Sequence, residues 1–123
     1  MKIQESGENY LETVYILQQR QGNIRAIDVA TELGYSKASV SRALGILRRA
    51  GYLVVDGVTG LIAFTPMGLD KAKSVYERHR CIKRFLISLG VDEEAADRDA
   101  CRMEHVIGEQ TFDAIRRSVE CEP

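Results

Sequence analysis

The feature that constrains the fold most is a change of hydrophobic periodicity near the middle of the chain. Residues 5–20, 27–33 and 36–50 carry apolar side chains three and four positions apart, which predicts three amphipathic helices. Two short β-rich runs follow at 52–55 and 61–64, separated by a turn that contains two glycines, and they predict a β-hairpin. Three helices closed by a hairpin are the plan of a winged helix-turn-helix.

The second half of the chain returns to helical spacing. Thr65-Pro66 predicts a helix start, because threonine is a good N-cap and proline suits the first helical position. This helix is expected to run to Leu89, which would lie on its apolar side. Two further helices are predicted at 92–107 and 109–119.

The order of these elements predicts a mainly α fold with two domains. We expect a winged helix-turn-helix DNA-binding domain at residues 1–65 and a helical domain at residues 66–123. A helical bundle with an incidental hairpin is the alternative. It is less favoured because the hairpin comes directly after the third helix, as a wing does.

The charge distribution is consistent with nucleic-acid binding, although the total charge is not. The chain has 17 basic and 18 acidic residues and a formal net charge of −1. From Leu33 to Val55, however, the charged residues are all basic. A locally basic segment lets a small regulator contact phosphates without a large overall charge. The alternative is a solvated helix face that is basic by chance.

The third predicted helix has Ser36 as a good N-cap, and Gly51 lies where a left-handed residue would end it. This helix is the one expected to enter the major groove. Val40, Leu44 and Leu47 form its apolar side, so its polar and basic side chains face away from the core. Side chains near its start suit base edges, and its arginines suit phosphates. The candidate DNA-binding residues are Ser36, Lys37, Ser39, Ser41, Arg42, Arg48 and Arg49, with Arg25 before the second helix. The hairpin turn carries one acid and no base, so we expect a minor contribution from the wing.

Two histidines lie among potential metal ligands. Cys101, Glu104 and His105 are spaced i, i+3 and i+4, so a thiol, a carboxylate and an imidazole share one helical face. These ligand types suit a divalent transition metal. The alternative is a buried cysteine beside a glutamate and a histidine at the wet edge of a helix. His79 interrupts an apolar stripe, where a lone histidine is more often a structural core residue than a ligand.

Three segments of the chain carry a family resemblance: residues 9–15 (NYLETVY), 77–80 (ERHR) and 99–106 (DACRMEHV). In this order they resemble signatures of the diphtheria toxin repressor family of metal-dependent transcriptional regulators. The resemblance covers about residues 5 to 120, and the combination is more specific than any single segment. It implies a winged-helix unit followed by a helical unit that binds metal and dimerises.

The resemblance also implies a ligand set. The implied metal ligands are Glu12, His79, Cys101, Glu104 and His105, with Asn9 as a doubtful sixth. The iron-responsive branch has methionine at position 9 and the manganese-responsive branch has aspartate, so the neutral Asn9 fits neither. Cys101 matches the iron branch and Glu12 matches the manganese branch. Lys83 replaces a glutamate that serves a second, ancillary metal in the iron branch, so we do not expect that site in its usual form.

The function implied is that of a repressor of metal uptake, which acts as a homodimer on a palindromic operator in double-stranded DNA. Fe(II) or Mn(II) is the expected cofactor, and Zn(II) is expected to occupy the site in purified samples. Metal would favour one orientation of the DNA-binding helices. Phe112, Ile115 and Val119 form an apolar stripe that is our candidate for part of the dimer surface. Packing of this stripe within one chain is an equally good interpretation.

Two other functions fit parts of the sequence. Cys101-x-x-Glu104-His105 differs by one residue from the H-x-x-E-H motif of zinc peptidases, but little chain remains to build a substrate cleft. We therefore expect no enzymatic activity. A winged-helix regulator that responds to another ligand, without metal, is the second alternative.

The sequence predicts a cytoplasmic protein. No apolar run approaches the roughly 20 residues that a membrane helix needs, and the polar N-terminus is unlike a secretory signal. Cys81, Cys101 and Cys121 are an odd and sparse set, which is typical of a reducing compartment.

Overall fold

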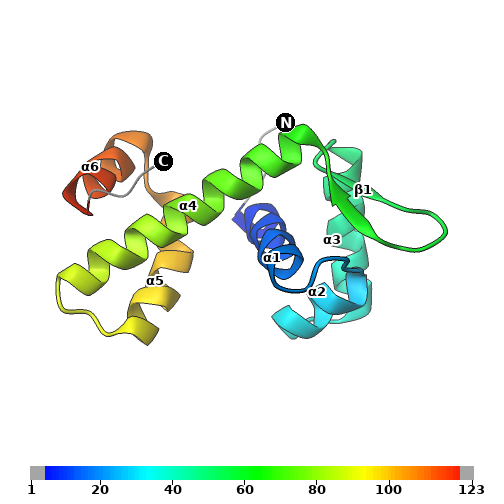
Figure 1. Ribbon diagram of the computed structural model, residues 1–123, viewed down its shortest axis with the longest axis horizontal. Coiled ribbons are helices and arrows are strands. Elements are labelled where there is room, and N and C mark those ends of the chain that lie inside the picture. Colours follow the sequence, from blue (N-terminus) through cyan, green and yellow to red (C-terminus); the bar gives the residue numbers. More distant parts are fainter. Residues whose placement is uncertain (1–4, 120–123) are drawn as a thin grey trace. The chain divides into compact units, whose positions relative to one another are not determined.

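The structure is a computed structural model that describes residues 5–119, so Cys121 lies outside the described part. The chain divides into two compact units between Lys73 and Ser74, within the long helix α4 (Pro66–Ser88). Figure 1 shows the elements of both units. Among the described helices, none combines the length and the apolar character that a membrane crossing requires. The domain boundary that we predicted between residues 65 and 66 coincides with the start of α4. The assignment of two domains that meet at this boundary stays a prediction.

The first unit is a winged helix-turn-helix, as predicted. Its elements are α1 (Glu5–Gln21), α2 (Ala26–Leu33), α3 (Lys37–Arg49), β1 (Leu53–Val55) and β2 (Ile62–Phe64), followed by the start of α4. The hairpin of β1 and β2 projects past α3 (Figure 1). The apolar core of this unit contains residues from all of these elements. Its fully buried side chains include Leu11, Val29, Val40 and Leu53.

The turn between α2 and α3 depends on local backbone chemistry. Gly34 ends α2 in the left-handed region, at φ 71°, where a side chain would be strained. The hydroxyl oxygen of Ser36 then accepts a hydrogen bond from the Ser39 N–H at 3.1 Å, which confirms Ser36 as the predicted N-cap of α3. Gly51, at φ 89°, follows the end of α3 as predicted.

The hairpin is tied to the helices as well as to itself. Its strands pair antiparallel, with Val54 opposite Ala63. The outer edge of β2 is joined to the loop before α2, because the Ile62 N–H donates to the carbonyl oxygen of Ile24 at 3.0 Å. The side-chain amide of Gln18 on α1 donates to the Ile62 carbonyl oxygen at 3.0 Å. The wing is therefore anchored to two other elements of its unit.

The start of α4 packs closely against the hairpin. Thr65 is the predicted cap: its hydroxyl oxygen accepts from the Gly68 N–H at 3.0 Å, and the hydroxyl donates to the Gly51 carbonyl oxygen at 2.6 Å. Gly68 lies so near β1 that a Cβ there would overlap the carbonyl oxygen of Tyr52. Only a glycine allows this approach.

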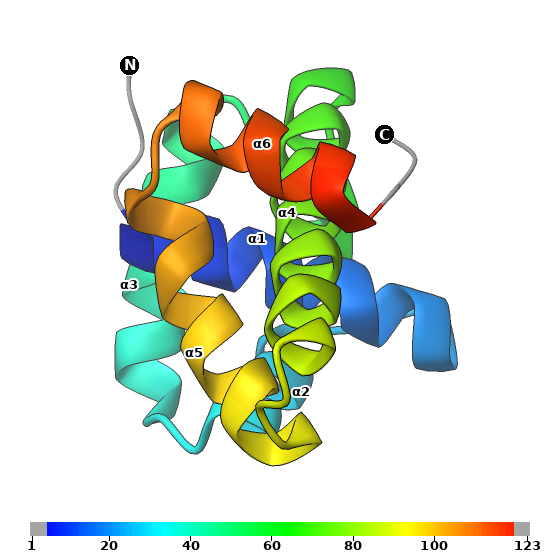
Figure 2. The ribbon, with the colours of Figure 1, turned by 90° about the vertical axis from the view of Figure 1, so that its left-hand side faces the viewer.

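The second unit contains the rest of α4 with α5 (Glu93–Val106) and α6 (Glu109–Val119). Figure 2 shows α6 crossing α4 at a steep angle. The buried core of this unit is small and is formed by Cys81, Ile82, Ala100, Phe112 and Ile115.

The end of α4 differs from the prediction. The helix ends at Ser88, and the side chain of Leu89 is 66% exposed instead of lying on the apolar side. The Leu89 N–H still donates to the Phe85 carbonyl oxygen at 3.3 Å, but Gly90 adopts φ 98° and ends the helix directly after it. Asp92 then caps α5, accepting from the N–H groups of Glu94 and Ala95 at 3.1 and 3.3 Å.

Candidate metal centre

Three potential ligands come together on one face of α5. A ligand atom from each of Cys101, Glu104 and His105 lies within 4.8 Å of the other two. The Glu104 side chain is 0% exposed and that of His105 is 2% exposed, whereas Cys101 is partly exposed. The helical spacing seen in the sequence therefore does bring a thiol, a carboxylate and an imidazole to one place.

His79 joins this cluster from α4. Its Nδ1 lies 2.9 Å from Glu104 Oε2, and the Nε2 of His105 lies 3.1 Å from Glu104 Oε1. The buried carboxylate thus lies between two imidazoles, one from each helix. A buried carboxylate is costly unless positive charge or hydrogen bonds compensate it. His79 is accordingly not an isolated core histidine.

Asp97 also contacts His79, and it was not among the residues predicted for the site. Its Oδ1 lies 2.9 Å from the Nε2 of His79. This hydrogen bond is the main cause that lowers the pKa of Asp97, and it outweighs the opposing effect of burial. Asp97 precedes Cys101 by one helical turn, so the i−4 spacing was the available signal.

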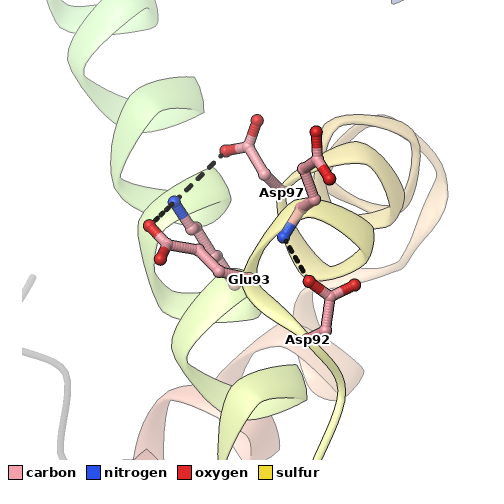
Figure 3. Close-up of a pocket in the computed structure, with 5 residues that line it drawn as sticks. Asp92, Glu93 and Asp97 are labelled. Carbon is pink, nitrogen blue, oxygen red and sulfur yellow. Dashed lines mark hydrogen bonds and ion pairs between the residues drawn. The ribbon is translucent and has the colours of Figure 1, made fainter.

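Lys83 lies next to Asp97. Its ammonium nitrogen is 3.5 Å from Asp97 Oδ1 and 3.6 Å from Glu93 Oε1 (Figure 3). These residues line an open pocket of about 400 Å³, together with Asp92 and Glu94. A basic side chain therefore lies beside these acids. The expectation that an ancillary metal does not bind in its usual form stays a prediction.

The donor set on α5 fits a divalent transition metal. Zinc bonds of about 2.0–2.3 Å to nitrogen, oxygen and sulfur place neighbouring ligand atoms roughly 3–4 Å apart. The spacing within 4.8 Å is close to this range. A thiolate favours iron(II), cobalt(II) or zinc, while carboxylate and imidazole also accept manganese(II). The assignment of each residue as a ligand stays a prediction.

The remaining predicted ligands are on α1. Glu12 is buried there, at 5% exposure. Asn9 precedes it by three residues, which places both on one side of the helix. The main-chain carbonyl oxygen of Asn9 accepts a hydrogen bond from the Thr13 hydroxyl at 2.8 Å. As metal ligands, Glu12 and Asn9 stay predictions.

The candidate DNA-binding residues on α3 and at its N-cap are all exposed. Val40, Leu44 and Leu47 are buried as predicted. The exposed residues are Ser36, Lys37, Ser39, Ser41, Arg42, Arg48 and Arg49. This surface is available for DNA, and the contacts themselves stay predictions.

Arg25 has a structural role that the sequence did not indicate. Its Nε donates to the carbonyl oxygen of Thr59 in the hairpin turn at 2.8 Å. Its main-chain N–H donates to the side chain of Asp28 at 2.8 Å, at the start of α2. Arg25 therefore links the wing to α2. It is also exposed, so its predicted phosphate contact stays a prediction.

The predicted dimer stripe is mostly internal to the second unit. Phe112 and Ile115 are 6% and 7% exposed in its core, and Val119 packs against that core. Packing within one chain accounts for this burial. The role of the three residues in dimerisation stays a prediction.

Each half of the chain matches a known domain family. Residues 2–61 match the iron dependent repressor N-terminal DNA binding domain, and residues 65–121 match the iron dependent repressor metal binding and dimerisation domain. Among curated relatives, the transcriptional regulator MntR of Escherichia coli O157:H7 is 36% identical over 109 residues, which is 89% of this chain and 70% of that protein. MntR of Lysinibacillus sphaericus is 33% identical over 115 residues, which is 94% of this chain and 82% of that protein.

Solved structures show the same fold. The manganese regulator SloR matches with a TM-score of 0.82 at 23% identity, over 99% of this chain and 56% of SloR. The metal-dependent transcriptional regulator MtsR matches with a TM-score of 0.84 at 24% identity, over 94% of this chain and 54% of MtsR. The chain thus spans little more than half of these two proteins. Together with the two family domains, these relatives show that the chain belongs to the iron-dependent, or diphtheria toxin, repressor family of metal-dependent transcriptional regulators.

Proposed function

We propose that this chain is a repressor of iron or manganese uptake whose operator binding requires a divalent metal. The observation that carries the proposal is the cluster of Cys101, Glu104 and His105, with His79 beside it on α4. The mixed sulfur, oxygen and nitrogen donors suit Fe(II) and Zn(II), and Mn(II) less well. We expect Fe(II) to activate at least as well as Mn(II), and Zn(II) to occupy the site in purified samples.

The second part of the proposal concerns the first unit. Glu12, and Asn9 with its neutral oxygen, would join the ligands from α1. A bound divalent ion would add positive charge beside the buried carboxylates Glu12 and Glu104. Ligation of both units would hold α1 and restrict the orientation of the DNA-binding unit. Thermodynamic linkage then requires DNA to raise the metal affinity by the same factor.

The third part concerns the partners. Exposed Ser36, Lys37 and Ser39 would meet base edges, while Arg42 and Arg48 would meet phosphates. We infer that the chain acts as a homodimer on a palindromic operator, because two identical recognition helices read a site with two-fold symmetry. We place it in the cytoplasm, with a regulatory role and no enzymatic one.

The test is DNA binding by the purified full chain, using duplexes that the metal-loaded protein selects from a random pool. Affinity is measured by fluorescence anisotropy with Fe(II) under anaerobic conditions, with Mn(II), with Zn(II) and with a chelator. We expect chelation to weaken binding to the selected duplex by more than tenfold, toward non-specific binding. Equal affinity with metal and with chelator would contradict the proposal and favour a metal-independent regulator.

Two arginine variants provide the control for this experiment. Arg42→Ala and Arg48→Ala should weaken binding to every duplex and reduce its salt dependence, because each removes a phosphate contact. The same variants should bind metal as the wild type does. This separates loss of DNA contact from loss of metal sensing.

A further inference from the structure

Both ring nitrogens of His79 face a carboxylate. Nδ1 faces Glu104 Oε2 in the candidate metal centre, and Nε2 faces Asp97 Oδ1, each at 2.9 Å. The hydrogen bond at one ring nitrogen of a histidine determines which nitrogen is left to bind a metal. Asp97 thus lies where it can accept the Nε2–H, which leaves Nδ1 as the nitrogen that would bind a metal in the candidate centre.

Asp97 is itself held by a cation from the same helix as His79. Lys83 follows His79 by one turn of α4, and its ammonium nitrogen lies 3.5 Å from the Asp97 oxygen that faces the imidazole. Figure 3 shows Asp97 and Glu93 converging on this ammonium. The other labelled acid, Asp92, accepts hydrogen bonds from the first turn of α5, so its carboxylate is engaged elsewhere.

We propose that Asp97 is a positioning residue for the metal centre, and that Lys83 is the built-in cation that holds Asp97 against His79. Without a positive charge, Asp97 would lie in a pocket lined by Asp92, Glu93 and Glu94, whose carboxylates repel it. The Lys83 ammonium offsets this repulsion permanently. The orientation of His79 is therefore provided by the protein and needs no second metal ion.

This inference rests on the proposed function, because it assigns Nδ1 of His79 to the metal centre. It adds that the centre is partly preorganised before metal arrives. A preorganised ligand loses less conformational freedom on binding, so the affinity of the centre for metal should depend on Asp97 although Asp97 is not a ligand.

The first measurement reads the imidazole directly, without metal. The chain has two histidines, so the ¹⁵N signals of the rings are easily assigned. At a pH where the imidazole is neutral, His79 should exist as the single tautomer that carries its proton on Nε2. In Asp97→Ala the Glu104 carboxylate still faces Nδ1, so we expect the proton to move from Nε2 to Nδ1. Asp99→Ala is the matched control, because Asp99 is an exposed aspartate two residues further along α5.

The second measurement is calorimetric titration of the metal-free full chain with Zn²⁺. Asp97→Ala should weaken Zn²⁺ binding by about 10- to 100-fold, as loss of an outer carboxylate partner of a ligand histidine usually does. Lys83→Met should weaken it by a smaller factor. Lys83→Arg should restore affinity close to that of the wild type, since it keeps the cation. Asp99→Ala should bind as the wild type does.

The outcomes separate the inference from the proposed function. An Asp97→Ala variant with the wild-type tautomer and the wild-type Zn²⁺ affinity would overturn the positioning role. A Lys83→Met variant that behaves as the wild type in both measurements would overturn the role of Lys83. A wild type that binds no Zn²⁺, but whose single tautomer is lost in Asp97→Ala, would support the positioning of His79 and contradict the proposed metal sensing.

Discussion

The two units of the chain bury very different side chains. In the winged-helix unit the core is a long apolar set contributed by α1, α2, α3, the hairpin and the start of α4. In the second unit the buried apolar set is short, and charged side chains lie beside it. Glu104 and His105 are nearly inaccessible there, and Arg78 is only 14% exposed. Buried polar residues of the first unit are confined to Glu12 and Thr13, as far as the structure describes it.

This difference indicates that the first unit is stable without a ligand, whereas the stability of the second unit depends on how its buried charges are compensated. An apolar core gains free energy from burial regardless of ligand. A core with buried carboxylates and imidazoles depends on how their charges are compensated, and that compensation changes with metal. The second unit is therefore the part whose stability a divalent ion can alter most directly. The first unit is suited to present the recognition helix in one fixed form.

The largest effect on stability is expected at Gly68, where the first unit leaves no space for a side chain. In Gly68→Ala the new methyl group would overlap the Tyr52 carbonyl oxygen and lie 2.8 Å from the Tyr52 carbonyl carbon. Because backbone atoms cannot move aside as a flexible side chain does, we expect a loss of about 3 kcal/mol or more in the free energy of unfolding. The measurement is urea denaturation, combined with hydrogen exchange to locate the loss in residues 5–64.

Gly57→Ala is the control for this variant. Gly57 lies in the exposed hairpin turn, its φ is not in the left-handed region, and a Cβ there would meet nothing within 4 Å. We expect a change within about 0.5 kcal/mol. If Gly68→Ala were equally mild, the close approach of α4 to the hairpin would not be a constraint of the fold.

A smaller effect is expected from the polar network of the second unit. Arg78 donates from Nε to the Glu104 carbonyl oxygen at 3.0 Å and from a terminal nitrogen to the Ile107 carbonyl oxygen at 2.7 Å. Its guanidinium also lies 4.8 Å from the centre of the Phe112 ring. Arg78→Ala leaves two acceptors at the end of α5 without this donor, so we expect a loss of about 2 kcal/mol.

The matched control is Arg80→Ala on the same helix. Arg80 pairs with Glu77 at 2.7 Å but is 49% exposed, and such surface pairs contribute about 0–1 kcal/mol. Hydrogen exchange should show the Arg78→Ala loss in α5 and α6 and little change in α1 to α3. Equal loss of protection in both units would instead show that α4 couples them into one cooperative unit.

Much of the fold could be predicted from the sequence because local signals agreed with one another. Helical spacing, the Ser36 cap, the Thr65-Pro66 start and the paired β-rich runs each indicated the element that is observed. Spacing also brought Cys101, Glu104 and His105 together, since neighbours on one helix face have a known separation.

The rest could not be predicted because it depends on contacts between distant elements. Asp97 meets His79 across two helices, and its i−4 spacing from Cys101 does not by itself indicate that pair. Gly68 looks like an unfavourable helix residue until its contact with Tyr52 is known. Arg25 was interpreted only as a phosphate contact, because its bond to Thr59 spans 34 positions.

The smallest effect should come from Asp56, the one acid in the wing turn. Its Oδ1 accepts from the N–H groups of Val58 and Thr59, each at 2.8 Å, and these hydrogen bonds hold the pKa of Asp56 below its ordinary value of 3.8. A carboxyl whose pKa is lowered on folding stabilises the native turn above its unfolded pKa, and this contribution is lost as pH falls through the folded pKa. The pH window of this contribution therefore lies below about pH 4.

We expect the Asp56 carboxyl to titrate by NMR below 3.8, with the Val58 and Thr59 amide signals following the same midpoint. In Asp56→Asn the side-chain oxygen can still accept both hydrogen bonds, so the turn should persist and those amide signals should no longer follow this titration. An Asp56 midpoint at or above 3.8 would show that the wing turn forms without its help, and would leave the first unit with still less dependence on charge than the second.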